Sequence, residues 1–122
     1  MLLGNPVAGT VIPIFTAVYG KRTKLYIPVG VEKRVDEPIG RLVDLLNDAQ
    51  TTGLRMAPLP GEIVTEIEAI RILSGAETTL AGSGGVLGAE GGAYFVAEGT
   101  EEELSTLNQI LDEVKKEPAF SL

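Results

Sequence analysis

The stretch from Gly82 to Gly92 constrains the fold more than any other, because it holds six of the chain's fifteen glycines within eleven residues. Glycine tolerates positive φ and lets a backbone lie against a ligand or a neighbouring chain. Strand-forming residues occupy positions 78–81 and 93–97 on either side. We therefore predict a loop at the edge of a sheet. The pattern leaves open whether this loop is a ligand site, a tight hairpin or a close contact with another subunit.

A helix is predicted directly after the second of these strands. The segment 100–103, Thr-Glu-Glu-Glu, has the pattern of a capping box, in which the threonine hydroxyl and the third-following carboxylate each satisfy a free backbone amide. Leu104, Leu107, Leu111 and Val114 then form one apolar line at helical spacing. This segment therefore predicts an amphipathic helix that packs on the rest of the domain.

The N-terminal part predicts the order strand, turn, helix and strand. Residues 2–6 allow a short strand, residues 4–10 form a turn, and residues 24–29 form a second strand. The composition between them suits either a strand or a helix, and Thr10, a good N-cap residue, favours a helix that runs to about residue 19. This order is that of a βαβ unit.

Two further helices are predicted in the middle of the chain. The first begins with Asp36 as its capping residue and has Pro38 in its first turn. The second spans residues 60–74 and ends at Gly75, which can adopt the left-handed conformation of a C-terminal cap. Its acidic residues, Glu62 among them, predict a solvated face rather than a metal site.

Composition narrows the classes of function. The length of 122 residues fits a single domain over residues 1–122, with ordinary hydrophobic and charged fractions of 44% and 22%. The absence of cysteine and histidine excludes disulfides, thiol chemistry and a histidine general base. We predict neither a metal nor a cofactor, and any catalysis would depend on carboxylates, lysine, tyrosine or hydroxyl groups.

The charge is acidic overall but unevenly distributed. A net charge of −7 argues against nucleic acid or an anionic membrane as the main partner. No apolar run is long enough to cross a bilayer, and no signal-like segment begins the chain, so we expect a cytoplasmic protein. Half of the basic residues nevertheless lie within fourteen positions, which indicates either a local anion site or solvated turns: Lys21, Arg22, Lys24, Lys33 and Arg34.

Two glycine-containing turns are the candidate ligand sites. Free amides at a helix N-terminus bind phosphate or carboxylate, which favours the turn at residues 4–10 as an anion site. In the glycine-rich loop, the hydroxyl and the carboxylate are the polar groups able to contact a ligand. The candidate ligand-binding residues are Gly4, Asn5, Gly9, Thr10, Ser83, Gly84, Gly85 and Glu90.

Three resemblances extend this interpretation. Residues 24–34, KLYIPVGVEKR, and residues 63–99 resemble a family of uncharacterised prokaryotic proteins, which implies no activity. The order strand, Gly/Thr turn, helix, strand, helix is similar to the C-terminal domain of pyruvate kinase, and this implies an effector-binding role for Gly9 and Thr10. Residues 62–116 are similar in their order of elements to the bacterial microcompartment shell module.

We therefore expect a three-layer α/β domain like the pyruvate kinase C-terminal domain, with a mixed, mostly parallel sheet of four to five strands and helices on both faces. The expected function is that of a binding or regulatory domain for a phosphorylated or carboxylated ligand. The alternative is a self-associating structural module of the shell type. A homo-oligomer is expected in both cases. An enzyme using Ser83, Lys24 or Glu90 is a third hypothesis, which no base–nucleophile spacing supports.

Overall fold

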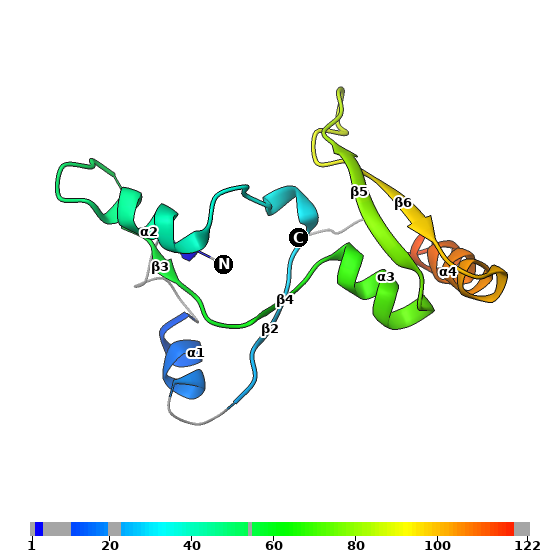
Figure 1. Cartoon of the computed structure of the whole chain (residues 1–122), viewed down its shortest axis with the longest axis horizontal. Coiled ribbons are helices and arrows are strands. Elements are labelled where there is room, and N and C mark those ends of the chain that lie inside the picture. The colour runs from blue at the N-terminus through cyan, green and yellow to red at the C-terminus, as the bar shows by residue number, and fades with distance from the viewer. Residues whose placement is uncertain (1, 4–10, 20–22, 54, 119–122) are drawn as a thin grey trace. The chain divides into compact units, whose positions relative to one another are not determined.

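The computed structural model describes residues 2–3, 11–19, 23–53 and 55–118, and it mixes helices with short strands as expected for the α/β class (Figure 1). The elements, in chain order, are β1 (Leu2–Leu3), α1 (Val11–Val18), β2 (Tyr26–Pro28), the 3₁₀ helix η1 (Val31–Lys33), α2 (Ile39–Asn47), β3 (Ala57–Pro58), β4 (Glu62–Val64), α3 (Glu66–Ser74), β5 (Glu77–Ser83), β6 (Ala93–Glu98) and α4 (Glu101–Val114).

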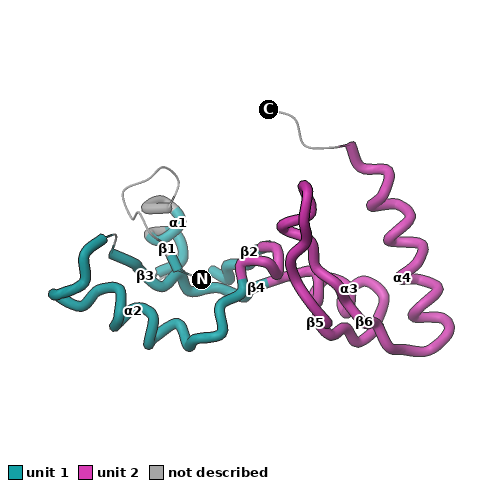
Figure 2. The backbone as a smooth tube through the Cα atoms, turned by 90° about the horizontal axis from the view of Figure 1, so that it is seen from above, with its two compact units in different colours: residues 1–28, 34–63 teal, residues 29–33, 64–122 magenta. Residues whose placement is uncertain are grey.

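The chain divides into two units (Figure 2). Unit 1 comprises residues 1–28 and 34–63, and unit 2 comprises residues 29–33 and 64–122. Unit 1 therefore contains α1, α2 and β1 to β3, whereas α3, α4 and the β5–β6 hairpin belong to unit 2. In the part of the chain that the structure describes, no helix has both the length and the apolar composition needed to span a membrane.

The strands of the described residues form three two-stranded sheets, β1–β3, β2–β4 and β5–β6. Because β1 pairs with β3 in antiparallel fashion, β1 and β2 lie in different sheets, and the predicted βαβ pairing is not observed. A single sheet of four or five strands is likewise not confirmed. Pro28 and Pro58 explain part of the difference, because each ends its strand and supplies no amide to extend a ladder.

Helix α1 confirms the helical interpretation of this ambiguous segment, although Thr10, its expected N-cap, lies outside the described residues. Phe15 and Tyr19 lie one turn apart, and their rings stack with centroids 5.4 Å apart. Such i, i+4 aromatic pairs stabilise a helix modestly. The stacked pair gives this short helix a side-chain contact of its own.

Helix α2 begins later than the sequence indicates. Its N-cap is Pro38, no side chain caps it, and Asp36 lies in an exposed bend, so the predicted capping role of Asp36 is wrong. Glu37 instead accepts a 2.7 Å hydrogen bond from Arg41 one turn ahead. This exposed ion pair contributes only about 0.3–0.5 kcal/mol to the stability of the fold.

The C-terminal end of α2 is held by side chains from the following loop. Arg55 donates to the carbonyl oxygens of Leu46 and Asp48 at 3.2 and 2.6 Å. The amide side chain of Asn47 donates to the Met56 carbonyl and accepts from the Met56 amide, both at 2.8 Å. These bonds satisfy carbonyls that a helix end leaves free and attach α2 to the segment that leads into β3.

Helix α3 starts at Glu66, six residues later than predicted from Pro60, because residues 62–64 form strand β4. Thr65 is the N-cap, and its hydroxyl and the Glu68 carboxylate complete a capping box. The start predicted at Pro60 is therefore wrong. Two β-branched residues in β4, Ile63 and Val64, favour the extended conformation just before this cap. The predicted end is confirmed, since Gly75 has a φ of 83°.

The β5–β6 hairpin of unit 2 is antiparallel and contains one irregularity. Leu80 pairs with Phe95 and Gly82 pairs with Tyr94, so Ala81 is an extra residue in β5. Exposure alternates along both strands, with Thr79 and Val96 on the more exposed face. Helix α3 contacts β5 and α4, which places the packed part of unit 2 at α3 (Figure 1).

Few residues are fully buried. The buried hydrophobic residues among those described are Ile27 in unit 1 and Val31, Ala76 and Leu107 in unit 2. The apolar residues on the inner face of the hairpin, such as Leu80 and Phe95, are only half-buried. Each unit thus leaves much of its apolar surface open to solvent.

Candidate functional site

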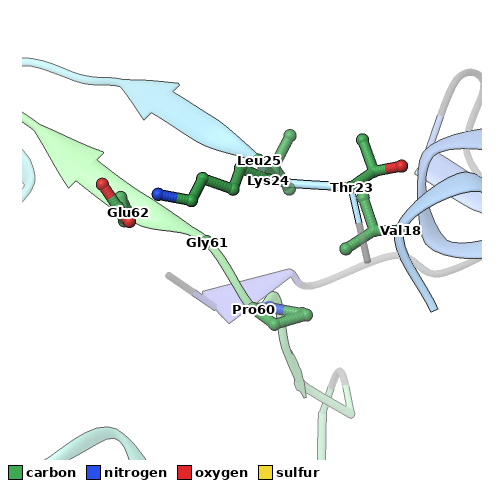
Figure 3. A pocket seen from close by; sticks show the side chains of 7 residues that line it. All are labelled: Val18, Thr23, Lys24, Leu25, Pro60, Gly61 and Glu62. Atoms are coloured by element: carbon green, nitrogen blue, oxygen red, sulfur yellow. The ribbon is translucent and has the colours of Figure 1, made fainter. Parts of the chain in front are cut away.

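A pocket of about 290 Å³ opens in unit 1 where the segment before β2 meets the start of β4 (Figure 3). Its size is near the lower limit of small-molecule sites, which typically measure about 300–1,000 Å³. Apolar atoms predominate in the wall, with one cation, one anion and one hydroxyl among them. The lining residues are Val18, Thr23, Lys24, Leu25, Pro60, Gly61 and Glu62.

Gly61 fixes the close approach of the two backbone segments at this pocket. A Cβ atom at this position would lie 2.8 Å from Ile27 Cδ1 and 2.9 Å from the Leu25 carbonyl oxygen. The adjacent Glu62 amide donates to the same carbonyl at 2.8 Å. A side chain at residue 61 would therefore push the segments apart, so the pocket floor depends on this glycine.

Two side chains of opposite charge line the pocket without forming an ion pair. Neither Lys24 nor Glu62 takes part in any of the salt bridges of the described residues. Both are exposed, so water solvates their charges when the pocket is empty. Either group is free to exchange that water for a ligand group of opposite charge.

The glycine-rich loop forms the tip of the β5–β6 hairpin in unit 2, as the hairpin interpretation of this stretch predicts. Its amides bind the loop's own carbonyls: Gly84 donates to Gly92 at 2.8 Å, and Gly92 donates to Ala89 at 2.9 Å. Gly84 and Gly88 have φ values of 100° and 96°, a region that glycine enters without strain. The glycines here bend the chain back on itself.

The carboxylate of Glu90 accepts a hydrogen bond from a further amide of this loop. Its Oε1 accepts from the Gly88 amide at 3.1 Å. This hydrogen bond, with a second one from the Glu90 backbone amide, lowers the pKa of the Glu90 carboxyl, because both favour the charged form. The loop therefore already holds an anion of its own where an external phosphate or carboxylate would be expected.

The predicted site residues divide into two groups. Four of them, Gly4, Asn5, Gly9 and Thr10, lie outside the described residues. The other four gather at the hairpin tip, where Ser83 ends β5 and Gly84, Gly85 and Glu90 follow in the loop. At Gly85, an added Cβ would overlap the Ala89 carbonyl oxygen, so this residue serves close packing within the loop.

The residues of the unit 1 pocket were not predicted as one site. The sequence places Lys24 in the basic cluster and names it in the enzyme hypothesis, and it places Glu62 only on a solvated helix face. The pocket joins residues that are 35 or more positions apart in the chain, 18–25 and 60–62. The one local signal was the pair Pro60-Gly61, which is typical of a turn and not of a helix interior.

The described residues offer little for metal or nucleophilic chemistry. They contain no group of three or more Asp or Glu side chains placed to hold a metal ion. Ser83 and Glu90 lie in the same hairpin, yet no hydrogen bond joins them in the part of the chain that the structure describes. A serine without a base in contact is a poor nucleophile.

Exposed apolar side chains lie on three elements of unit 2. On β6, Tyr94 and Val96 are 67% and 52% exposed. Further exposed apolar residues lie on the two helices of this unit: Ile72 and Leu73 on α3, and Leu111 and Val114 on α4. Tyr94 and Val96 share the exposed face of one strand, which makes this face the candidate interaction surface of the unit.

Comparison with known proteins gives no relative for this chain: no family model, no curated protein and no solved structure matches it.

Proposed function

We propose that the chain is a self-associating structural module in which a second copy pairs with the free edge of strand β6. The single observation that carries this proposal is the exposure of Tyr94 and Val96, at 67% and 52%, on a strand that pairs only with β5 among the described residues. Helix α3 contacts the hairpin at β5, so the outer edge of β6 is the side on which a further strand can add. Further strands would cover apolar surface and satisfy the backbone groups of the open edge.

The edge of β6 suits such pairing better than the edge of β5. Ala81 forms a bulge in β5, and bulges hinder edge-to-edge pairing. β6 runs from Ala93 to Glu98 without an extra residue or a proline. Its exposed face also carries the larger apolar side chains. We therefore place the second copy on β6.

Twofold pairing of two β6 strands is compatible with their faces and charges. In an antiparallel pair, directly opposite residues point to the same face. With Phe95 opposite Phe95 of the second copy, Tyr94 lies opposite Val96 and Glu98 lies opposite Gly92. With Val96 opposite itself, Glu98 lies opposite Tyr94. Neither register brings two carboxylates together, and both place Tyr94 or Val96 in cross-strand contact with an apolar or aromatic side chain of the second copy.

The resemblances are consistent with this proposal. The order helix, strand, glycine-rich loop, strand and helix, which is similar to the microcompartment shell module, runs from α3 to α4. The three-layer, mostly parallel sheet of the pyruvate kinase type stays a proposal of the sequence.

Substitution of Val96 by Asp tests the paired edge. Val96 is half exposed in the single chain, so Val96→Asp should leave the fold of the hairpin intact but place a charge in the dimer contact. We expect sedimentation velocity to show dissociation at concentrations where the wild-type chain is a dimer. The matched control is Val86→Asp at the hairpin tip, where the valine is 76% exposed. Equal association of both variants and the wild type would contradict the proposal.

A second candidate function is the binding of a small phosphorylated or carboxylated ligand. It is favoured by one specific observation, the pocket of unit 1 with Lys24 in its wall. The hairpin loop supports it less, because Glu90 and the loop carbonyls already use several of the loop's amides. Binding of a carboxylate to the wild-type chain, and its loss in Lys24→Met, would support this candidate.

A further inference from the structure

We infer that the pocket of unit 1 takes a zwitterionic small molecule, an α-amino acid with an apolar side chain. Lys24 would bind its carboxylate, and Glu62 would bind its ammonium group. This inference rests on the second candidate function and narrows its ligand class. The carrying observation is that one pocket is lined by a lysine and a glutamate that form no salt bridge in the described residues.

The charge balance of the pocket selects between ligand classes. A phosphate or a simple carboxylate would be attracted by the Lys24 ammonium but repelled by the Glu62 carboxylate. A ligand with only an ammonium group would be attracted by the Glu62 carboxylate but repelled by the Lys24 ammonium. A molecule with one group of each charge satisfies both side chains, and hydrogen bonds between charged groups are the stronger ones in proteins.

The remaining wall fits an aliphatic side chain. Val18, Leu25 and Pro60 contribute apolar surface, and Thr23 is the only other polar side chain in the lining (Figure 3). The volume of about 290 Å³ leaves room for a branched aliphatic amino acid but not for a nucleotide or a large cofactor. Burial of the aliphatic group would supply affinity, and the two charges would fix its orientation.

The pocket is braced on the side that carries both charges. Gly61 allows the two segments to approach, and the 2.8 Å hydrogen bond from the Glu62 amide to the Leu25 carbonyl joins them. Lys24 directly precedes Leu25 in the chain. The backbone positions of the two charged residues are therefore fixed relative to each other before a ligand binds, which lowers the entropy cost of binding.

Isothermal titration calorimetry of the full chain tests the inference with four probes: L-leucine, 4-methylpentanoate, which lacks the amine, isopentylamine, which lacks the carboxylate, and inorganic phosphate. We expect leucine to bind, and each single-charge analogue to bind about two- to fivefold more weakly, since the lost contact is with a solvent-exposed charge. Lys24→Met and Glu62→Gln should each weaken leucine binding by about the same factor. Asp44→Asn, an exposed position on α2, should leave it unchanged.

The outcomes separate this inference from the function on which it rests. If phosphate or 4-methylpentanoate binds as tightly as leucine, the zwitterion inference is overturned while the second candidate function stands. If none of the four probes binds, both are overturned. Circular dichroism checks that each variant is folded, and the comparison of the four probes on the wild-type chain decides the question even where a variant fails to fold.

Discussion

At the scale of single residues, the sequence allowed an external anion to bind the glycine-rich loop, whereas in the structure the Glu90 carboxylate binds one of the loop amides. The Gly88 amide is used by the Glu90 carboxylate, and Gly85 is required because a side chain there would overlap Ala89. Sequence alone predicted a loop and a choice between ligand site and hairpin. It could not show which amides remain free, because that depends on how the loop closes on itself.

The titration of Glu90 follows from this contact. Its pKa is lowered in the folded chain, so its contribution to stability is present above the unfolded pKa and is lost as the pH falls through the folded pKa. We expect NMR titration of the Glu90 carboxyl carbon to give a midpoint below the usual value of a glutamate side chain. The Gly88 amide shift should change with the same midpoint.

Replacement of Glu90 by Gln provides the control. In Glu90→Gln, the pH-dependent change of the Gly88 amide shift should disappear, because the group that titrates is gone. A Glu90 midpoint equal to that of an ordinary exposed glutamate would show that the Gly88 amide is free. The interpretation of the loop as an anion site would then be supported.

At the scale of elements, the two capping boxes of unit 2 show what sequence can and cannot predict. The box at Thr100 was found because an apolar line at helical spacing follows it directly, and α4 starts where predicted. The equivalent box at Thr65 was missed. Pro60 predicted an earlier helix start, so residues 62–64 were assigned to the helix and not to a strand. Local signals thus located helix ends, but they could not decide between competing starts.

The pairing of strands was the least predictable feature of the fold. β1 pairs with β3 across more than fifty residues of sequence, and no residue pattern in strands of two or three residues specifies such a partner. The pocket of unit 1 depends on the same kind of distant contact. Long-range pairing is decided by the packing of the whole unit, which a single sequence does not display.

The Thr65 cap gives a prediction at this scale. In Thr65→Ala, the hydroxyl that accepts from the Ile67 amide and contacts Glu68 is lost, and removal of such a cap costs about 1 kcal/mol of folding stability. Urea denaturation followed by circular dichroism should show this loss. Ser105→Ala, at an exposed position within α4, should not destabilise the chain, because alanine favours a helix. Equal stability of the two variants would contradict the assigned helix start.

At the scale of the whole molecule, the described residues bury little apolar surface for a chain of this length. Among the residues that the structure describes, only four hydrophobic ones are buried, while large apolar side chains on β6, α3 and α4 are exposed. Burial of apolar area is the main favourable term in folding, and a chain that leaves it incomplete gains stability from a partner. We propose a second copy as this partner, because among the described residues β6 pairs only with β5.

The most direct test of this account is the mass of the full-length chain in solution as a function of concentration, measured by sedimentation equilibrium. The account predicts a reversible rise to twice the mass of one chain, accompanied by protection of the β6 amides from hydrogen exchange at high concentration. A single-chain mass at all concentrations up to the millimolar range, with β6 amides that exchange freely, would contradict it.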